Sequence, residues 1–186
     1  MSILILGLVL FFGIHLAATI PSVKGAITKR VGKKGYKGVH ALISLAGLGL
    51  IIWGYAHKPL ISIPEWVAPS WAYKSVLPLL WLGVVLQPAA HMKSNIKRVT
   101  RHPMLWGIVI WSGVHLWLNG DHASILLFGS FLLYSLWAMF AANQRGAKKQ
   151  TIKYPFMSDM KVIVAGTVAY GLLVFGHKWF AGVALM

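Results

Sequence analysis

The basic residues of this chain fall into three clusters that are separated by pairs of apolar segments. Fifteen of the 18 Lys and Arg side chains lie at positions 24–37, 93–101 and 145–161. The other three are Lys58, Lys74 and Lys178. Short loops rich in Lys and Arg stay on the cytoplasmic side of a membrane. The pattern therefore predicts a polytopic membrane protein whose two termini face the outer, periplasmic side.

Composition favours the same class of protein. The chain is 58% hydrophobic and 11% charged, whereas a soluble domain carries about 25% charged residues. The net charge of +15 thus indicates topology and attraction to anionic lipid headgroups, and we expect no nucleic-acid partner. The chain has no cysteine, which excludes disulfides, thiolate metal sites and covalently attached haem.

Six apolar segments approach the length of about 20 residues that crosses a bilayer. They are residues 2–20, 39–56, 75–90, 103–118, 123–142 and 162–184. The first lacks a basic leading region and precedes a positive cluster, so we expect it to remain as a span rather than to be cleaved as a signal peptide. The fold class predicted is all-α, a bundle of about six transmembrane helices in one domain, residues 1–186.

Two connections are informative. The turn Asn119-Gly120-Asp121 is too short for anything but an antiparallel helical hairpin, so helices 103–118 and 123–142 should be neighbours. The longer loop before residue 75 carries Trp66, Trp71 and Tyr73. Such amphipathic aromatics favour the headgroup level, and we expect this loop to lie on the outer interface.

Eight histidines are unusual in so apolar a chain, because ionisable residues inside a bilayer are costly and often functional. Five are expected at helix ends among headgroups and water: His40, His57, His91, His122 and His177. His15 and His115 lie deepest, each within an apolar sequence. Each could simply bond a neighbouring helix, but two deep imidazoles could also be the axial ligands of a haem iron.

The string at residues 100–107, TRHPMLWG, opens the fourth apolar segment. Pro103 suits the first turn of a helix, where its missing N–H costs nothing. Arg101 and His102 then lie at the cytoplasmic end of that helix, where they could hold a propionate, phosphate or carboxylate. The alternative is a basic helix start that serves topology alone.

These motifs carry a resemblance over nearly the full length. With Gly13-Ile14-His15, Thr100-Arg101-His102-Pro103 and the segment 111–117 around His115, the chain resembles the NnrU-like family of bacterial membrane proteins. That family is linked to nitrite and nitric oxide reduction and is related to 15-cis-zeta-carotene isomerase. The resemblance implies a bacterial inner-membrane location and a b-type haem with His15 and His115 as axial ligands.

The resemblance also implies an activity that depends on the redox state of the iron, and a cysteine that exchanges as ligand. This chain has Ser112 at the matching position, and Leu16 where the family motif has a serine. Haem binding therefore transfers better than isomerase chemistry. Helical rise places His15 and His115 about 6 Å to opposite sides of their helix midpoints, so His102 or His91 is the alternative partner for His15.

Three functions follow as hypotheses. The first is a haem b protein for redox sensing, electron transfer or isomerisation in nitrogen-oxide respiration, with a small hydrophobic substrate or a redox partner. The second is a methyltransferase, because the RHPxxxG string also resembles the isoprenylcysteine carboxyl methyltransferase group and its S-adenosylmethionine pocket. Those enzymes carry a Glu in the next cytoplasmic segment, where residues 143–161 offer only Asp159. The third is a colourless accessory protein or transporter that is indifferent to loss of His15 or His115.

Overall fold

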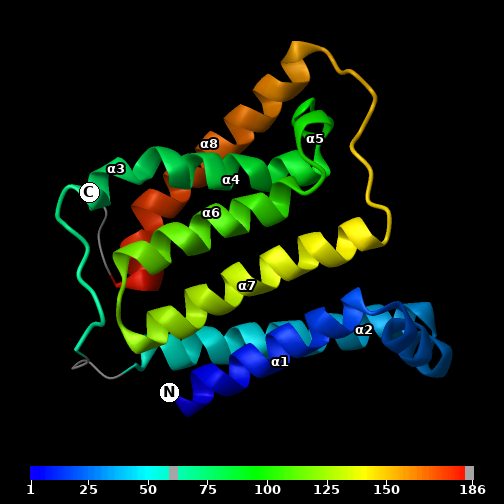
Figure 1. The fold of residues 1–186 in the computed structure, drawn as a ribbon, viewed down its shortest axis with the longest axis horizontal. Helices are drawn as coiled ribbons and strands as arrows, with labels where there is room; N and C mark the ends of the chain where they lie inside the picture. Colours follow the sequence, from blue (N-terminus) through cyan, green and yellow to red (C-terminus); the bar gives the residue numbers. More distant parts are fainter. Residues whose placement is uncertain (59–62, 183–186) are drawn as a thin grey trace.

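A computed structural model describes residues 1–58 and 63–182, and these residues form an all-helical structure with no strand among them (Figure 1). The helices are α1 (Ser2–Thr19), α2 (Pro21–Ala56), α3 (Ala72–Ser75), α4 (Leu77–His91), α5 (Ile96–Val99), α6 (Pro103–Leu118), α7 (His122–Gln144) and α8 (Phe156–Ala181). The all-α prediction is confirmed. The predicted end of the last segment, residues 183–184, lies outside the described residues.

Helix α2 corrects one expectation. The sequence predicted a basic loop before residue 39, but the structure is helical from Pro21 onward, with one interruption at Gly32. Pro21 starts this helix, since its fixed φ angle suits the first turn. Gly32 has φ 74° and ψ 167°, a conformation that glycine adopts without steric cost. The basic stretch is therefore a short helix, residues 21–31, followed by the long helix 33–56.

The long helices lie in a single series in the order α2, α1, α7, α6, α4, α8 (Figure 1). Each packs against its neighbour in that series, so α6 and α7 form the predicted hairpin. Helix α1 begins and α8 ends at one end of the bundle, whereas the three connections with basic clusters lie at the other end (Figure 1). This arrangement agrees with an even number of crossings.

The α1–α2 pair is packed closely through glycine. A Cβ atom on Gly7 would lie 2.6 Å from the backbone nitrogen of Ile51, and one on Gly54 would overlap the backbone of Leu4. The main apolar core joins this pair to α7 through Leu4, Leu8, Phe12, Ile51, Ala123, Leu127 and Phe128. Small residues allow helix backbones to approach in this way in membranes.

Four of the described helices are long and apolar enough to cross a membrane: Ser2–Thr19, Pro21–Ala56, His122–Gln144 and Phe156–Trp179. Helix α6 is apolar but has 16 residues, which gives it a length of about 24 Å against a hydrocarbon core of about 30 Å. The protein is thus membrane-spanning. The number of six spans and the outward position of the termini stay predictions.

Candidate functional site

His15 lies half-buried on α1, near the end of the bundle that carries the basic clusters. Its Nδ1 donates to the carbonyl oxygen of Phe11, one turn earlier, over 2.6 Å. The ring also lies against Phe11 at 4.3 Å and Tyr134 at 5.8 Å between centroids. Since Nδ1 carries the proton, Nε2 keeps the lone pair that can bind a metal.

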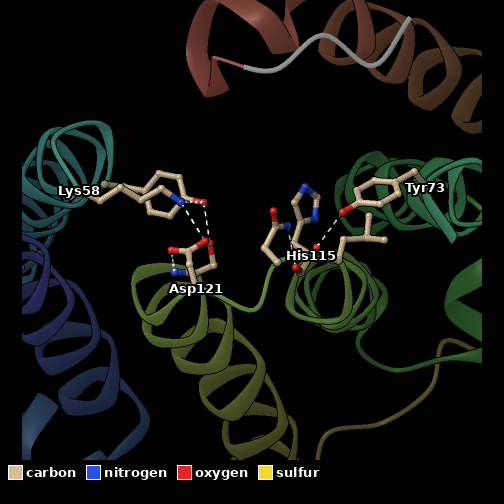
Figure 2. Close-up of polar contacts among 8 residues, drawn as sticks. Lys58, Tyr73, His115 and Asp121 are labelled. Atoms are coloured by element: carbon tan, nitrogen blue, oxygen red, sulfur yellow. Dashed lines mark hydrogen bonds and ion pairs between the residues drawn. The ribbon is translucent and has the colours of Figure 1, made fainter. Parts of the chain in front are cut away.

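His115 has the same local arrangement near the opposite end of the bundle. Its Nδ1 donates to the carbonyl oxygen of Trp111 over 2.8 Å, and its ring packs against Phe128 with centroids 4.8 Å apart. The α6–α7 turn follows at once, and Figure 2 shows His115 beside it, across from Lys58 and Asp121. Here too Nε2 is left as the potential ligand atom.

The two histidines do not face each other. The rings of Phe11, Phe131 and Trp111 form a continuous line between them, with centroids of 5.6 Å from Phe11 to Phe131 and 5.4 Å from Phe131 to Trp111. Along α7, His115 is level with Phe128 and His15 with Tyr134, a difference of about 9 Å. Each imidazole alone suits an iron atom, but the pair does not lie on one axis.

Arg101 and His102 do come together, at the start of α6. The Arg101 Nη1 and the His102 Nε2 both donate to Oδ1 of Asn143, over 2.9 Å and 3.0 Å. Asn143 belongs to the last turn of α7, and no motif in the sequence singles it out. Two N–H donors therefore converge on one position, and an anionic oxygen could accept both bonds there in place of the amide oxygen of Asn143.

The residue that faces His15 is His40, which the sequence placed at the interface. The two ring centroids are 4.9 Å apart. A usable signal existed, because both residues lie toward the same end of two helices that are consecutive and antiparallel. His91 is exposed at the end of α4, and His102 is engaged with Asn143.

Ser112 occupies the position at which the resemblance implied a cysteine. It is fully buried, and its hydroxyl donates to the carbonyl oxygen of Ile108 over 2.6 Å. This intrahelical bond is typical of a serine inside an apolar helix. Ser112 thus has a local structural role in α6.

A polar cluster joins α2 and α7 at the end near His115 (Figure 2). The Lys58 amino group lies 3.0 Å from Oδ2 of Asp121, which also accepts from the Ser124 hydroxyl over 2.6 Å. Burial opposes ionisation of Asp121, but the bonds from Ser124 and Lys58 outweigh it and lower the pKa of this carboxyl. Burial likewise lowers the pKa of Lys58, but the bond to Asp121 outweighs it, and the net pKa is raised.

At the opposite end, Asp159 holds the α7–α8 connection in place. Its two carboxylate oxygens accept from the backbone N–H and the side-chain amide of Asn95, over 2.6 Å and 2.7 Å. Asn95 also pairs with the backbone of Tyr154 in both directions. The acid that the methyltransferase hypothesis required is therefore engaged in a structural contact.

Comparison with known proteins places this geometry in context. The chain is 25% identical over 167 residues to the chloroplastic 15-cis-zeta-carotene isomerase of Arabidopsis thaliana, an alignment that covers 80% of this chain and 45% of that protein. The chain thus spans less than half the length of that relative. No solved structure matches. The family model described as "NnrU protein" matches residues 3–185, and the chain therefore belongs to the NnrU family.

Proposed function

We propose that this protein is a redox- or isomerase-type membrane protein of the bacterial inner membrane that binds b-type haem through His115 and His15. Two facts support the general role. The chain belongs to the NnrU family. Its relative from Arabidopsis thaliana is a 15-cis-zeta-carotene isomerase, and a carotene is an apolar molecule. A substrate of that class dissolves in the bilayer. The alternative to such a substrate is a redox partner protein of nitrogen-oxide respiration, which the family suggests.

The observation that carries the cofactor assignment is the orientation of the two imidazoles. In each, Nδ1 donates to the carbonyl oxygen one turn earlier, at 2.6 Å for His15 and 2.8 Å for His115. The bond from Nδ1 fixes the tautomer and the ring plane, as the bond of the non-ligating nitrogen does in histidines that bind metals. Both rings pack against aromatic side chains, Phe11 beside His15 and Phe128 beside His115.

Haem bound at these histidines would supply a redox-active iron. The chain's own contribution would be to orient the ligand rings and to hold an anionic propionate with Arg101 or His102. Joint ligation by His15 and His115 requires the rings of Phe11, Phe131 and Trp111 to move.

The test is the absorption spectrum of the detergent-purified protein, oxidised and reduced with dithionite, in four forms. The variants are His15→Ala, His115→Ala and the control His57→Ala. His57 makes the same bond, from Nδ1 to the carbonyl oxygen of Trp53 over 2.9 Å, but it is exposed. We expect a Soret band and sharp reduced α and β bands in the wild type and in His57→Ala.

Loss of these bands in both His15→Ala and His115→Ala would support joint ligation, and loss in one alone would identify a single protein ligand. A colourless wild-type protein from haem-replete cells contradicts the proposal and favours an accessory protein or transporter. Binding of S-adenosylmethionine would then be measured, although the two bonds from Asn95 to Asp159 already occupy the acid of that hypothesis.

A further inference from the structure

His15 and His40 form a two-imidazole cluster that the proposed haem ligation does not use as a pair. The rings come from α1 and α2, and their centroids are 4.9 Å apart with planes at 67°. Both side chains are half-buried, so a solute ion at this end of the bundle has access to them. Near the cluster the two helices pack closely, because a Cβ atom on Gly47 would lie 2.7 Å from the backbone nitrogen of Phe11, one turn before His15.

The spacing distinguishes two kinds of metal site. With a metal–nitrogen bond of about 2 Å, each ring centroid lies about 3 Å from the metal. Two imidazoles in adjacent coordination positions then have centroids about 4.5–5 Å apart, whereas trans ligands of one iron have centroids about 6 Å apart. The observed 4.9 Å corresponds to adjacent positions on a small ion.

The proton positions also suit a metal. The Nδ1 atom of His15 donates to the carbonyl oxygen of Phe11, and the Nδ1 atom of His40 lies 3.4 Å from the hydroxyl of Ser44. In each ring Nδ1 makes the polar contact with a residue of its own helix, which leaves Nε2 free to bind a metal ion. Ligand histidines in proteins commonly have such a partner behind them.

Tyr36 provides an independent observation. It lies one turn before His40 on α2, is 8% exposed, and its ring centroid is 6.0 Å from that of His40. Its hydroxyl is buried and has no hydrogen-bond partner within the part of the chain that the structure describes. A buried, unsatisfied hydroxyl is costly and calls for an explanation, such as an ion.

The surroundings narrow the class of ion. Within the described residues no third His, Cys, Asp or Glu joins this pair, so the cluster lacks the carboxylate oxygens that Mg²⁺ and Ca²⁺ prefer. Neutral imidazoles suit copper, zinc, iron and nickel.

We propose that, in the absence of haem at His15, His15 and His40 together with the hydroxyl of Tyr36 form a binding site for one first-row transition-metal ion. Water completes the coordination, and the phenol proton leaves to solvent when the ion binds. The inference goes beyond the proposed function, but it shares His15 with it. Haem ligation by His15 and occupation of this site therefore exclude each other.

The test uses the whole chain in detergent, produced under haem-deficient growth, stripped of metal with a chelator and titrated with Cu²⁺ in the presence of a competing weak chelator. Bound copper is measured by equilibrium dialysis and by electron paramagnetic resonance, in which imidazole nitrogens split the signal. We expect one ion per chain, with affinity reduced at least tenfold in His15→Ala and in His40→Ala. In Tyr36→Phe we expect loss of the visible band from phenolate to Cu²⁺.

Two controls keep folding and surface binding apart from the site. His57→Ala removes an exposed histidine just beyond the end of α2, and it should bind copper as the wild type does. His40→Asn keeps a polar side chain of similar size and should lose copper while it elutes as a monodisperse species. Copper binding that is unchanged in His40→Asn, or that depends on His115, overturns the proposal.

The outcomes separate this inference from the proposed function. Copper binding that needs His40, in a protein that never takes up haem, supports the metal site and contradicts the haem assignment. Haem bands without any copper binding in the haem-free protein overturn the metal site alone. If both ligands bind through His15, reconstitution with haem should lower the copper content, and His40→Asn should keep its haem bands.

Discussion

Lys58, just beyond the end of α2, forms an ion pair of 3.0 Å with Asp121, the residue that caps the start of α7. The contact joins two segments that lie 63 residues apart in the chain. It ties the α1–α2 pair to the α6–α7 hairpin at one end of the bundle (Figure 2).

Asp121→Ala should therefore lower the free energy of unfolding. Loss of the N-cap bond to Ser124 costs about 1 kcal/mol, and loss of the partly exposed ion pair costs at most about 1 kcal/mol more. Asp121→Asn keeps an oxygen that can accept from the Ser124 backbone N–H but loses Oδ2, the acceptor of Lys58 and of the Ser124 hydroxyl, so its effect should be the smaller of the two. Thermal unfolding followed by tryptophan fluorescence in detergent measures both. Equal stability of Asp121→Ala and the wild type contradicts the prediction.

The same pair sets a pH dependence with a definite sign. Because the pKa of Asp121 is lowered in the folded protein, its contribution is present above the unfolded pKa and is lost as the pH falls through the folded value. Because the pKa of Lys58 is raised in the folded protein, its contribution is present below the pKa of a free lysine and is lost as the pH rises through the folded value. Asp121→Asn should flatten the acid limb of the stability curve relative to the wild type.

Gly54 and Gly49 offer a matched pair on α2. A Cβ atom at Gly54 would overlap the backbone of Leu4, whereas one at Gly49 has no neighbour within 4 Å. Gly54→Ala should destabilise the protein by about 1–3 kcal/mol through overpacking, and Gly49→Ala should be neutral or slightly stabilising because alanine favours the helix. Unfolding in detergent gives both values. The reverse order would exclude the close α1–α2 contact.

Asp159 should control the order of the α7–α8 connection. Asp159→Ala removes the two carboxylate oxygens that accept from Asn95 and leaves the side chain of Asn95 with its bonds to Tyr154, so we expect faster proteolysis between residues 145 and 155. Limited digestion of inside-out vesicles with trypsin, followed by mass spectrometry, locates the cleavage. Lys153→Gln, a change at an exposed residue of the same connection, should leave cleavage at its other basic residues unchanged.

The orientation in the membrane can be tested without background, because the chain has no cysteine. Ser70→Cys lies in the exposed loop before α3, and Thr151→Cys lies in the exposed connection after α7. A membrane-impermeant maleimide should label the first in intact spheroplasts and the second only after permeabilisation. The opposite pattern would invert the predicted topology.

Local sequence signals predicted much of this fold. Residues 103–118 form α6 with the predicted bounds, since Pro103 starts a helix and Asn119-Gly120 ends one. The helix at 21–31 was missed, because a run of basic residues indicates a cytoplasmic loop in the absence of packing information. Hydropathy also could not show that Gly32 absorbs the change of direction.

The site was less accessible to sequence reasoning. The depths of His15 and His115 were derived from helical rise, and the offset along the bundle that this predicted is present in the structure. The neighbours His40 and Asn143 depend on which helix faces which. Such contacts follow from tertiary packing, which a single sequence does not contain.

The serial order of the helices divides the molecule into two bodies that could move against each other. The α1–α2 hairpin contacts the rest mainly through α7, and Phe131 of α7 is the middle member of the aromatic line between His15 and His115. A tilt of this hairpin would change the distance between those two histidines and leave His15 and His40 together. A single motion would thus separate His15 from His115, the proposed haem ligands, while it kept His15 beside His40 in the proposed metal site.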